Sequence, residues 1–192
     1  MKDYSEIVSV IKSELLKVRI KLNPITSKKR IAKLEEKYNF KIPESYKVFL
    51  TEIGNGGDSA YYGIYGVDTN NFLKYLERNR DILNKEPFLK SDMIDEEWET
   101  FSQNIDNAVE SDDDSEYERL EDQFYNGLIP IECQGCSYEI YMVLNGKDAG
   151  RLVYIDMDFN GKPFFCYEND ILEWYERFLR EKINGYKQFW FG

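Results

Sequence analysis

The chain has 192 residues, of which 42% are hydrophobic and 16% aromatic, and its formal net charge is −11 at pH 7. This composition is typical of a folded globular protein and excludes a disordered one, and the length fits one domain, or at most two small ones. The chain contains no histidine. That absence excludes Ser-His-Asp and Cys-His catalytic systems and His-ligated zinc. Carboxylates, Lys, Tyr and Cys can still act as acids and bases, but we expect a protein that is not an enzyme.

The N-terminus and the cysteine count both favour a cytoplasmic protein. Acidic residues interrupt the start of the chain, so no secretory signal is predicted. No apolar run approaches the roughly 18 residues that indicate a membrane span, so we expect no membrane partner. The three cysteines cannot all pair within one chain. Free thiols indicate a reducing compartment.

The first part of the chain predicts helices. Apolar residues spaced three and four apart predict an amphipathic helix over 7–22, which Asn23-Pro24 ends. Thr26 or Ser27 can cap a second helix, which carries Ile31, Leu34 and Tyr38.

A third helix is predicted to begin at Pro43, and Gly54 is expected to end it in the left-handed conformation. An aromatic-rich segment at 61–67 predicts a strand. The following apolar pattern predicts helices over 70–83, 95–108 and 115–125.

The last third of the chain predicts strands and one final helix. Asn160-Gly161 favours a tight type I′ turn between strands at 153–158 and 163–167. The final helix is predicted to begin near Asp170. A short apolar run lies at 128–131, and a further strand is predicted at 138–144; the strand before the turn has its apolar residues at 152–157. Helices followed by strands predict an α+β fold, in one domain over 1–192.

Several motifs in this order resemble one family. They are I-A-K-L-E at 31–35, I-P-E-S-Y-K-V-F-L at 42–50, N-G-G at 55–57, G-C-S-Y at 135–138 and L-N-G at 144–146. Together with the Trp-bearing final helix, they resemble the SMI1/KNR4 family of the SUKH superfamily. The resemblance spans about residues 27–183, and the segment at about 85–127 has no counterpart in it.

The resemblance implies a non-enzymatic α+β domain with a central, largely antiparallel sheet flanked by helices. Bacterial members resemble immunity proteins of polymorphic toxin systems, which neutralise a cognate toxin, often a nuclease or deaminase, by direct binding. Fungal members are regulators of cell-wall (glucan) synthesis, and a regulatory scaffold is therefore the alternative function.

Charge is concentrated in one segment of the chain. Residues 92–122 hold 14 Asp/Glu and one Arg, whereas the rest of the chain holds 22 acidic and 24 basic side chains. We interpret the segment at about 85–127 as an acidic helical insert, which is either a solvated loop or a surface for a basic protein partner. The candidate contact residues there are Asp112, Asp113, Asp114 and Glu116.

The chain also has a basic segment. Residues 12–47 hold 11 Lys/Arg and four Glu. These carboxylates dilute the basic charge and the acidic segment repels phosphate, so no nucleic-acid partner is expected.

The N-G-G loop is the second candidate contact region. Asn55, Gly56 and Gly57 predict a turn with positive φ, whose bare N–H groups could instead approach a partner. Tyr61 and Tyr62 follow closely, and Tyr is enriched in protein interfaces. The loop lacks the Lys-Ser/Thr of a phosphate-binding loop, so nucleotide binding is not expected.

The cysteines and the C-terminal tail are interpreted structurally. Cys133 and Cys136 form a C-x-x-C motif, but a strand follows it and only Cys166 remains, so we expect buried thiols and no metal or other cofactor. The aromatic tail at 186–192 is expected to dock on the domain.

Overall fold

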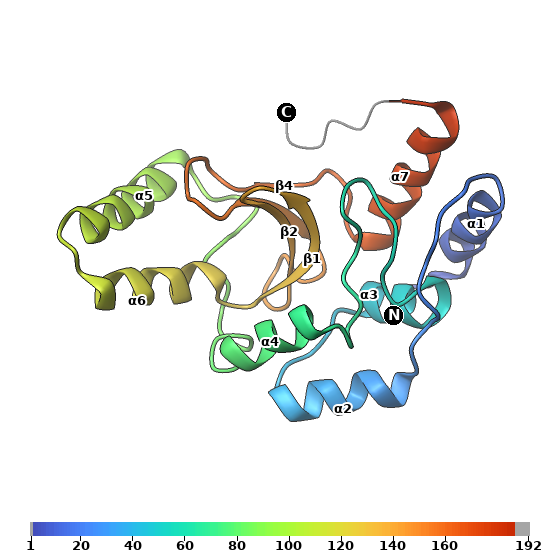
Figure 1. The fold of residues 1–192 in the computed structure, drawn as a ribbon, viewed down its shortest axis with the longest axis horizontal. Helices are drawn as coiled ribbons and strands as arrows, with labels where there is room; N and C mark the ends of the chain where they lie inside the picture. The colour runs from blue at the N-terminus through green and yellow to red at the C-terminus, as the bar shows by residue number, and fades with distance from the viewer. Residues whose placement is uncertain (1, 187–192) are drawn as a thin grey trace.

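In the computed structural model, which describes residues 2–186, an antiparallel sheet lies between two layers of helices (Figure 1). The four strands are consecutive neighbours in the order β1-β2-β3-β4. Their bounds are β1 Leu128–Gly135, β2 Tyr138–Val143, β3 Leu152–Asp156 and β4 Phe164–Phe165. The helices are α1 Ser5–Leu15, α2 Lys28–Tyr38, α3 Glu44–Val48, the π-helix η1 Phe49–Ile53, α4 Asn70–Arg78, α5 Asp95–Glu110, α6 Asp114–Tyr125 and α7 Ile171–Asn184.

The larger hydrophobic core lies on one face of the sheet. Ile140 of β2 and Tyr154 of β3 belong to it, together with buried side chains of α1, α2, α3, η1, α4 and α7. Trp174 and Tyr175 of α7 are fully buried, and the Trp174 indole donates a hydrogen bond to the Tyr154 hydroxyl at 3.0 Å. The final helix is therefore fixed directly to the sheet.

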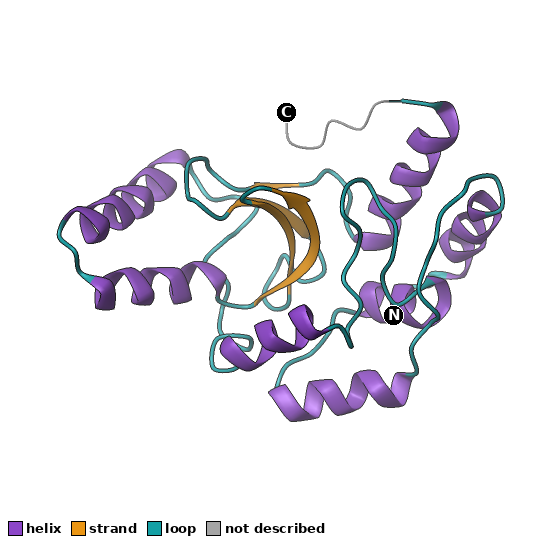
Figure 2. Cartoon of the chain, viewed as in Figure 1, coloured by secondary structure: helices purple, strands orange, loops and turns teal. Residues whose placement is uncertain are grey.

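The smaller core lies on the opposite face, under a hairpin formed by α5 and α6. Figure 2 shows these two helices on the side of the sheet away from α1 and α7. Phe101 of α5 and Phe124 of α6 stack with ring centroids 5.6 Å apart, and they pack with Val143 and Val153 of the sheet. Because both faces are covered, every residue of β3 is buried.

The α+β class and most of the predicted helices are confirmed. Ser27 caps α2, since its hydroxyl accepts the backbone N–H of Arg30, and Asp170 caps α7. The two predicted helices of the acidic segment are α5 and α6. The predicted helix over 70–83 is shorter, because α4 ends at Arg78 and turns follow.

The prediction that the first helix extends to Leu22 is wrong, since α1 ends at Leu15. The residues that follow pair with the N-G-G loop instead: Asp58 N donates to Lys21 O at 2.9 Å and Asn23 N donates to Gly56 O at 2.9 Å. These contacts require extended backbone, so tertiary pairing overrides the helical spacing of Val18 and Leu22.

Two predictions around the third helix are also wrong. Gly54 has φ −178°, which is extended and not left-handed. Glycine is needed there for packing, because a Cβ would lie 2.9 Å from Leu22 Cβ. Residues 61–67 form only isolated bridges at Ile64 and no regular strand, because Gly63 at φ +97° interrupts the extended backbone.

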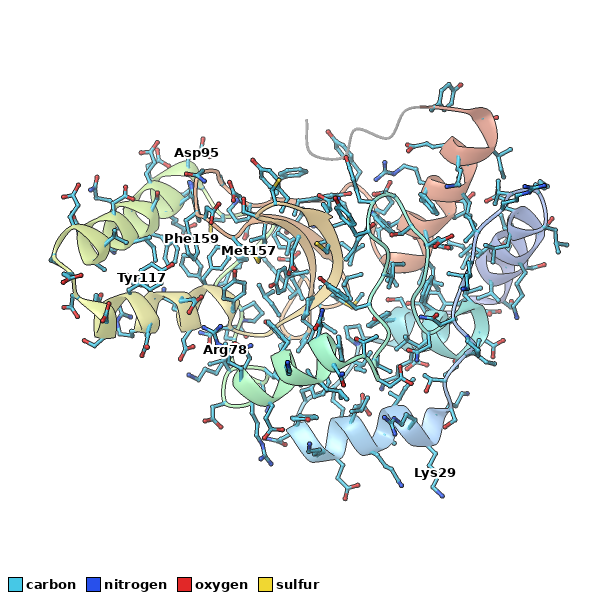
Figure 3. All side chains as sticks on the ribbon, in the orientation of Figure 1. Lys29, Arg78, Asp95, Tyr117, Met157 and Phe159 are labelled. Atoms are coloured by element: carbon cyan, nitrogen blue, oxygen red, sulfur yellow. The ribbon has the colours of Figure 1, made fainter. Side chains whose placement is uncertain are left out.

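The predicted type I′ turn at Asn160-Gly161 is absent, because neither residue has positive φ and the loop between β3 and β4 is longer. Phe159 takes the left-handed conformation, at φ +57°, and buries its ring 4.9 Å from that of Phe124. Figure 3 labels Phe159 between the sheet and the hairpin. Burial of this ring therefore determines the path of the loop.

The packing of the hairpin predicts that it contributes to global stability. Phe101→Ala, at a site only 3% exposed, should lower the free energy of unfolding by about 3–5 kcal/mol. Val109→Ala, at a site 61% exposed on the same helix, is the control and should have little effect. Urea denaturation followed by circular dichroism measures both. An unchanged unfolding transition in Phe101→Ala would mean that the hairpin is an independent appendage.

Candidate partner-binding surfaces

The N-G-G loop lies inside the protein, between the segments at 21–23 and 64–66. The side-chain oxygen of Asn55 accepts Val67 N–H at 3.0 Å, and its amide donates to the Asp68 carboxylate at 2.8 Å. Gly57 N–H donates to Ile64 O at 3.0 Å, and Ile64 N–H returns a bond to Gly57 O at 2.8 Å. The loop thus connects three segments of backbone.

The predicted turn is confirmed, since Gly56 has φ +79° and Gly57 has φ +125°. The alternative, in which bare N–H groups approach a partner, is wrong for this loop. Asn55 and Gly56 are buried, and the Asn55 and Gly57 N–H groups both donate to carbonyls of the protein itself. Neighbouring backbone also leaves no room: a Cβ on Gly56 would lie 2.5 Å from Ile64 O.

The tyrosines after this loop are at the surface. Tyr61 is 40% exposed and Tyr62 is 78% exposed. Their loop lies along β1, where Tyr62 N–H donates to Cys133 O at 3.3 Å. A Cβ on Gly135 would lie 2.7 Å from the Tyr62 ring, so this glycine of β1 makes room for the ring. Tyr61 and Tyr62 therefore remain candidate contact residues, whereas Asn55, Gly56 and Gly57 hold the loop that precedes them.

Below the tyrosine loop lies Glu132, a buried carboxylate that the sequence analysis did not single out. One carboxylate oxygen accepts the Ser59 hydroxyl and, at 3.1 Å, the Tyr61 N–H. The other oxygen has no hydrogen-bond partner among the described residues. Burial raises the pKa of Glu132 to about 7, against the lowering effect of these bonds. The only signal in the sequence is an acidic residue directly after the apolar run at 128–131.

Glu35 is a second buried carboxylate, and its pKa is shifted in the opposite direction from that of Glu132. Burial acts to raise its pKa, but Lys47 at 2.9 Å and Ile42 N–H at 2.8 Å outweigh burial, and the pKa is lowered. Glu132 has no such cation, since only Ser59 and backbone N–H groups lower its pKa. Its ionised form is therefore unfavourable in the folded protein.

The four acidic candidates lie at the free end of the hairpin. Asp112 and Asp113 form the turn between α5 and α6, and Asp114 and Glu116 follow in the first turn of α6. Asp113 also caps α6, because its carboxylate accepts Glu116 N–H at 3.1 Å. Asp112, Asp113 and Asp114 are exposed, and Glu116 is half-buried beside Arg119.

The hairpin is rigidly attached but electrostatically unbalanced. Three of its carboxylates pair with cations of the body, Asp92 with Lys147, Asp95 with Lys162 and Glu121 with Arg78, and Glu116 pairs with Arg119. Figure 3 labels Asp95 and Arg78 at the two edges where the hairpin meets the body. The other ten acidic side chains are exposed and form no ion pair with the described residues: Glu96, Glu97, Glu99, Asp106, Glu110, Asp112, Asp113, Asp114, Glu118 and Asp122.

The expectation that the thiols of the C-x-x-C motif are buried is wrong. Cys136 is exposed in the two-residue turn between β1 and β2, Cys133 is half-buried, and only Cys166 is buried.

Within residues 2–186, no three His, Cys, Asp or Glu side chains come together in a way that could hold a metal ion. No helix in the same range combines the length and the hydropathy needed to cross a membrane. Of the aromatic tail at 186–192, only Tyr186 is described, and its side chain is 67% exposed; the predicted docking of the other residues lies outside the described part of the chain.

The fold is an α+β domain in which an antiparallel sheet lies between two helical layers and the N-G-G loop is buried. A model of the SMI1/KNR4 family (SUKH-1) matches residues 25–182, which is most of the chain. The protein therefore belongs to the SMI1/KNR4 family, as its motifs predicted. SUKH domains include immunity proteins, and members typically bind protein partners such as toxins. The family is generally non-catalytic. Neither a curated protein nor a solved structure matches the chain.

The N-G-G loop yields a stability prediction. Gly56→Ala should lower the free energy of unfolding by about 3 kcal/mol, because the new Cβ meets backbone in a conformation that alanine rarely adopts. The control is Gly161→Ala, where nothing lies within 4 Å and φ is not positive, and it should be nearly neutral. Thermal melts distinguish the two. Equal melting temperatures for both variants would contradict the packing described for the loop.

Glu132 yields a pH prediction. Its pKa is about 7 in the folded protein and near 4.5 when unfolded, so the folded state holds an extra proton between these values and stability falls as pH rises through them. Glu132→Gln removes this loss, so it should raise the free energy of unfolding by about 3 kcal/mol at pH values above about 7, and much less near the unfolded pKa.

Urea denaturation at the two ends of this pH range measures the effect. Glu35→Gln is the matched control with the opposite sign: it should destabilise the protein at neutral pH, where the paired carboxylate of Glu35 is ionised. If Glu132→Gln changed stability equally at both ends, Glu132 would not titrate in this range.

Proposed function

We propose that this protein is a non-enzymatic, immunity-type binding protein that neutralises a cognate toxin by direct contact in the cytoplasm. Membership of the SMI1/KNR4 family supports a protein partner. The observation that carries the proposal is the hairpin, whose ten unpaired, exposed carboxylates face solvent on helices that are packed firmly against the sheet.

The arrangement of these charges supports a binding role over simple solubility. Like charges on one hairpin repel each other, and a solubilising coat needs no concentration of charge in one segment. The residues outside 92–122 carry a formal charge of only +2, against −13 within. A basic partner would relieve this repulsion and would be drawn to the hairpin from solution.

The chemistry of the partner follows from the sign of the charge. Toxins that are nucleases or deaminases act on nucleic acid, and proteins that bind its phosphate groups do so with Lys and Arg side chains. Carboxylates on a rigid hairpin can occupy the same positions as those phosphates and block access of the substrate. We therefore expect a basic protein partner, and neither nucleic acid nor membrane, because the hairpin repels phosphate.

The alternative is a regulatory scaffold linked to cell-wall synthesis, which the family resemblance also allows. The reading frame beside the gene separates the two functions. Co-expression of this protein with a toxin domain encoded there should rescue growth, and purified protein should inhibit that domain in stoichiometric amounts. Growth arrest despite stable co-expression would contradict the immunity function and favour the scaffold.

The hairpin tip yields a kinetic prediction for this toxin domain. Replacing Asp112, Asp113 and Asp114 with Asn and Glu116 with Gln should keep the fold, since asparagine at position 113 still caps α6. Association should slow by about tenfold and become less dependent on salt, because charges at the rim of an interface act mainly on the on-rate. Stopped-flow measurements over a salt series test this.

The control has the same change in net charge away from the tip of the hairpin. Glu6, Glu36, Glu44 and Asp81 are exposed and form no ion pair with described residues. Changing them to Gln and Asn should alter the on-rate much less. If both variants slow association equally, only net charge matters, and the tyrosine loop becomes the candidate contact surface.

A further inference from the structure

A second charged surface lies away from the tip of the hairpin, in a groove between α2 and α4. The groove has a volume of about 460 Å³, and Leu34, Tyr38 and Leu73 contribute its apolar lining. The helix α2 belongs to the basic segment at 12–47, whose net positive charge is evident in the sequence.

The rim of the groove is basic. Arg30 and Lys33 of α2 and Lys74 of α4 line it, and none of the three pairs with a carboxylate of the described residues. Lys37 also lines it but is already engaged, since it pairs with Glu77 at 3.4 Å and donates to the Tyr38 hydroxyl at 2.7 Å. Three cations without a carboxylate partner among the described residues therefore line the groove together with its apolar side chains.

The tip of the hairpin has the same pattern with the opposite charge. Val109 is exposed at the end of α5, and Glu110, Asp112 and Asp114, which are exposed and form no ion pair with the described residues, follow it along the chain. An exposed apolar side chain next to like charges is the counterpart of the groove, in which an apolar lining lies next to cations.

We propose that the hairpin tip of one copy of this protein docks in the α2–α4 groove of a second copy. Val109 lies against Leu73, which is partly exposed, and the tip carboxylates face Arg30, Lys33 and Lys74. The contact joins two different surfaces, so each copy keeps one free tip and one free groove, and association proceeds head to tail. The inference depends on the charges and shapes of these surfaces and not on the proposed toxin.

The two surfaces cannot meet within one molecule. Figure 1 places the turn between α5 and α6 at one extreme of the molecule, with α6 and α4 between it and α2. The pairing of Arg78 of α4 with Glu121 of α6, at 2.8 Å, and the packed core of the hairpin hold the tip away from the groove of its own chain. A contact between the tip and the groove therefore joins two copies of the chain.

Salt should affect this association in two ways. The net charge of −11 makes copies repel each other at long range, whereas opposite charges in contact attract. At about 0.1 M salt the screening length is about 10 Å, so the long-range repulsion is weakened while the contact pairs persist. At about 1 M the length falls to about 3 Å and the contact pairs weaken as well. Association should therefore disappear at high salt.

Sedimentation equilibrium of the full chain over a concentration series tests the proposal. At about 0.1 M salt the weight-average mass should rise with concentration beyond that of a dimer, because head-to-tail growth does not close. Two variants should each remain monomeric. The groove variant carries Arg30→Gln, Lys33→Gln and Lys74→Gln, and the tip variant carries Glu110→Gln, Asp112→Asn and Asp114→Asn.

An equal mixture of the two variants provides the most specific outcome. The groove variant keeps its native tip and the tip variant keeps its native groove, so the mixture should form one-to-one dimers and stop there. A control variant with Lys17→Gln, Arg19→Gln and Lys21→Gln has the same charge as the groove variant and should associate as the native chain does.

Three results would overturn the proposal. A native chain that stays monomeric at all concentrations excludes the contact. Association that persists in either variant, or that the control variant loses, excludes these two surfaces. If an acidic peptide of unrelated sequence binds the groove while the native chain stays monomeric, the occupant is not a second copy.

Discussion

The constraint on which the rest of this structure depends is the burial of the sheet on both faces. Its two central strands, β2 and β3, supply apolar side chains to both cores. Ile140 and Tyr154 lie on one side of the sheet, and Val143 and Val153 lie on the other. Exposing either face would cost about 25 cal/mol for each Å² of apolar surface. The α5–α6 hairpin is therefore needed to complete the fold, and its charged outer surface is held on a rigid support.

The N-G-G loop is the second organising element, and it acts through backbone. Gly56 and Gly57 allow the segments at 21–23 and 64–66 to approach closely, and Asn55 bonds to both Val67 and Asp68. This packing directs the chain that follows along β1 and over Glu132. A buried carboxylate without a cation destabilises the ionised state, so the stability of the fold falls as pH rises through the pKa of Glu132.

The distribution of charge gives the molecule two poles. The hairpin has the negative pole, and the α2–α4 groove has a smaller positive one. A basic partner and a second copy of the chain would both use the hairpin tip, so binding of one would exclude the other. Self-association would then lower the concentration of free tips, and a partner that binds more tightly would release them.

The sequence by itself determined the family, the α+β class and most helices, because motif order, caps and helical periodicity are local properties. Ser27 and Asp170 cap the helices that the sequence assigned to them. It also located the acidic segment, since net charge requires no structure. Only the tertiary structure decided the end of α1, the extended conformation of Gly54 and the loop at Phe159. At these positions a local preference, worth about 1 kcal/mol or less, competes with pairing or with burial of a ring, which is worth about 2–3 kcal/mol. The sequence could not predict the role of Glu132, because its burial depends on strands and a loop that are distant along the chain.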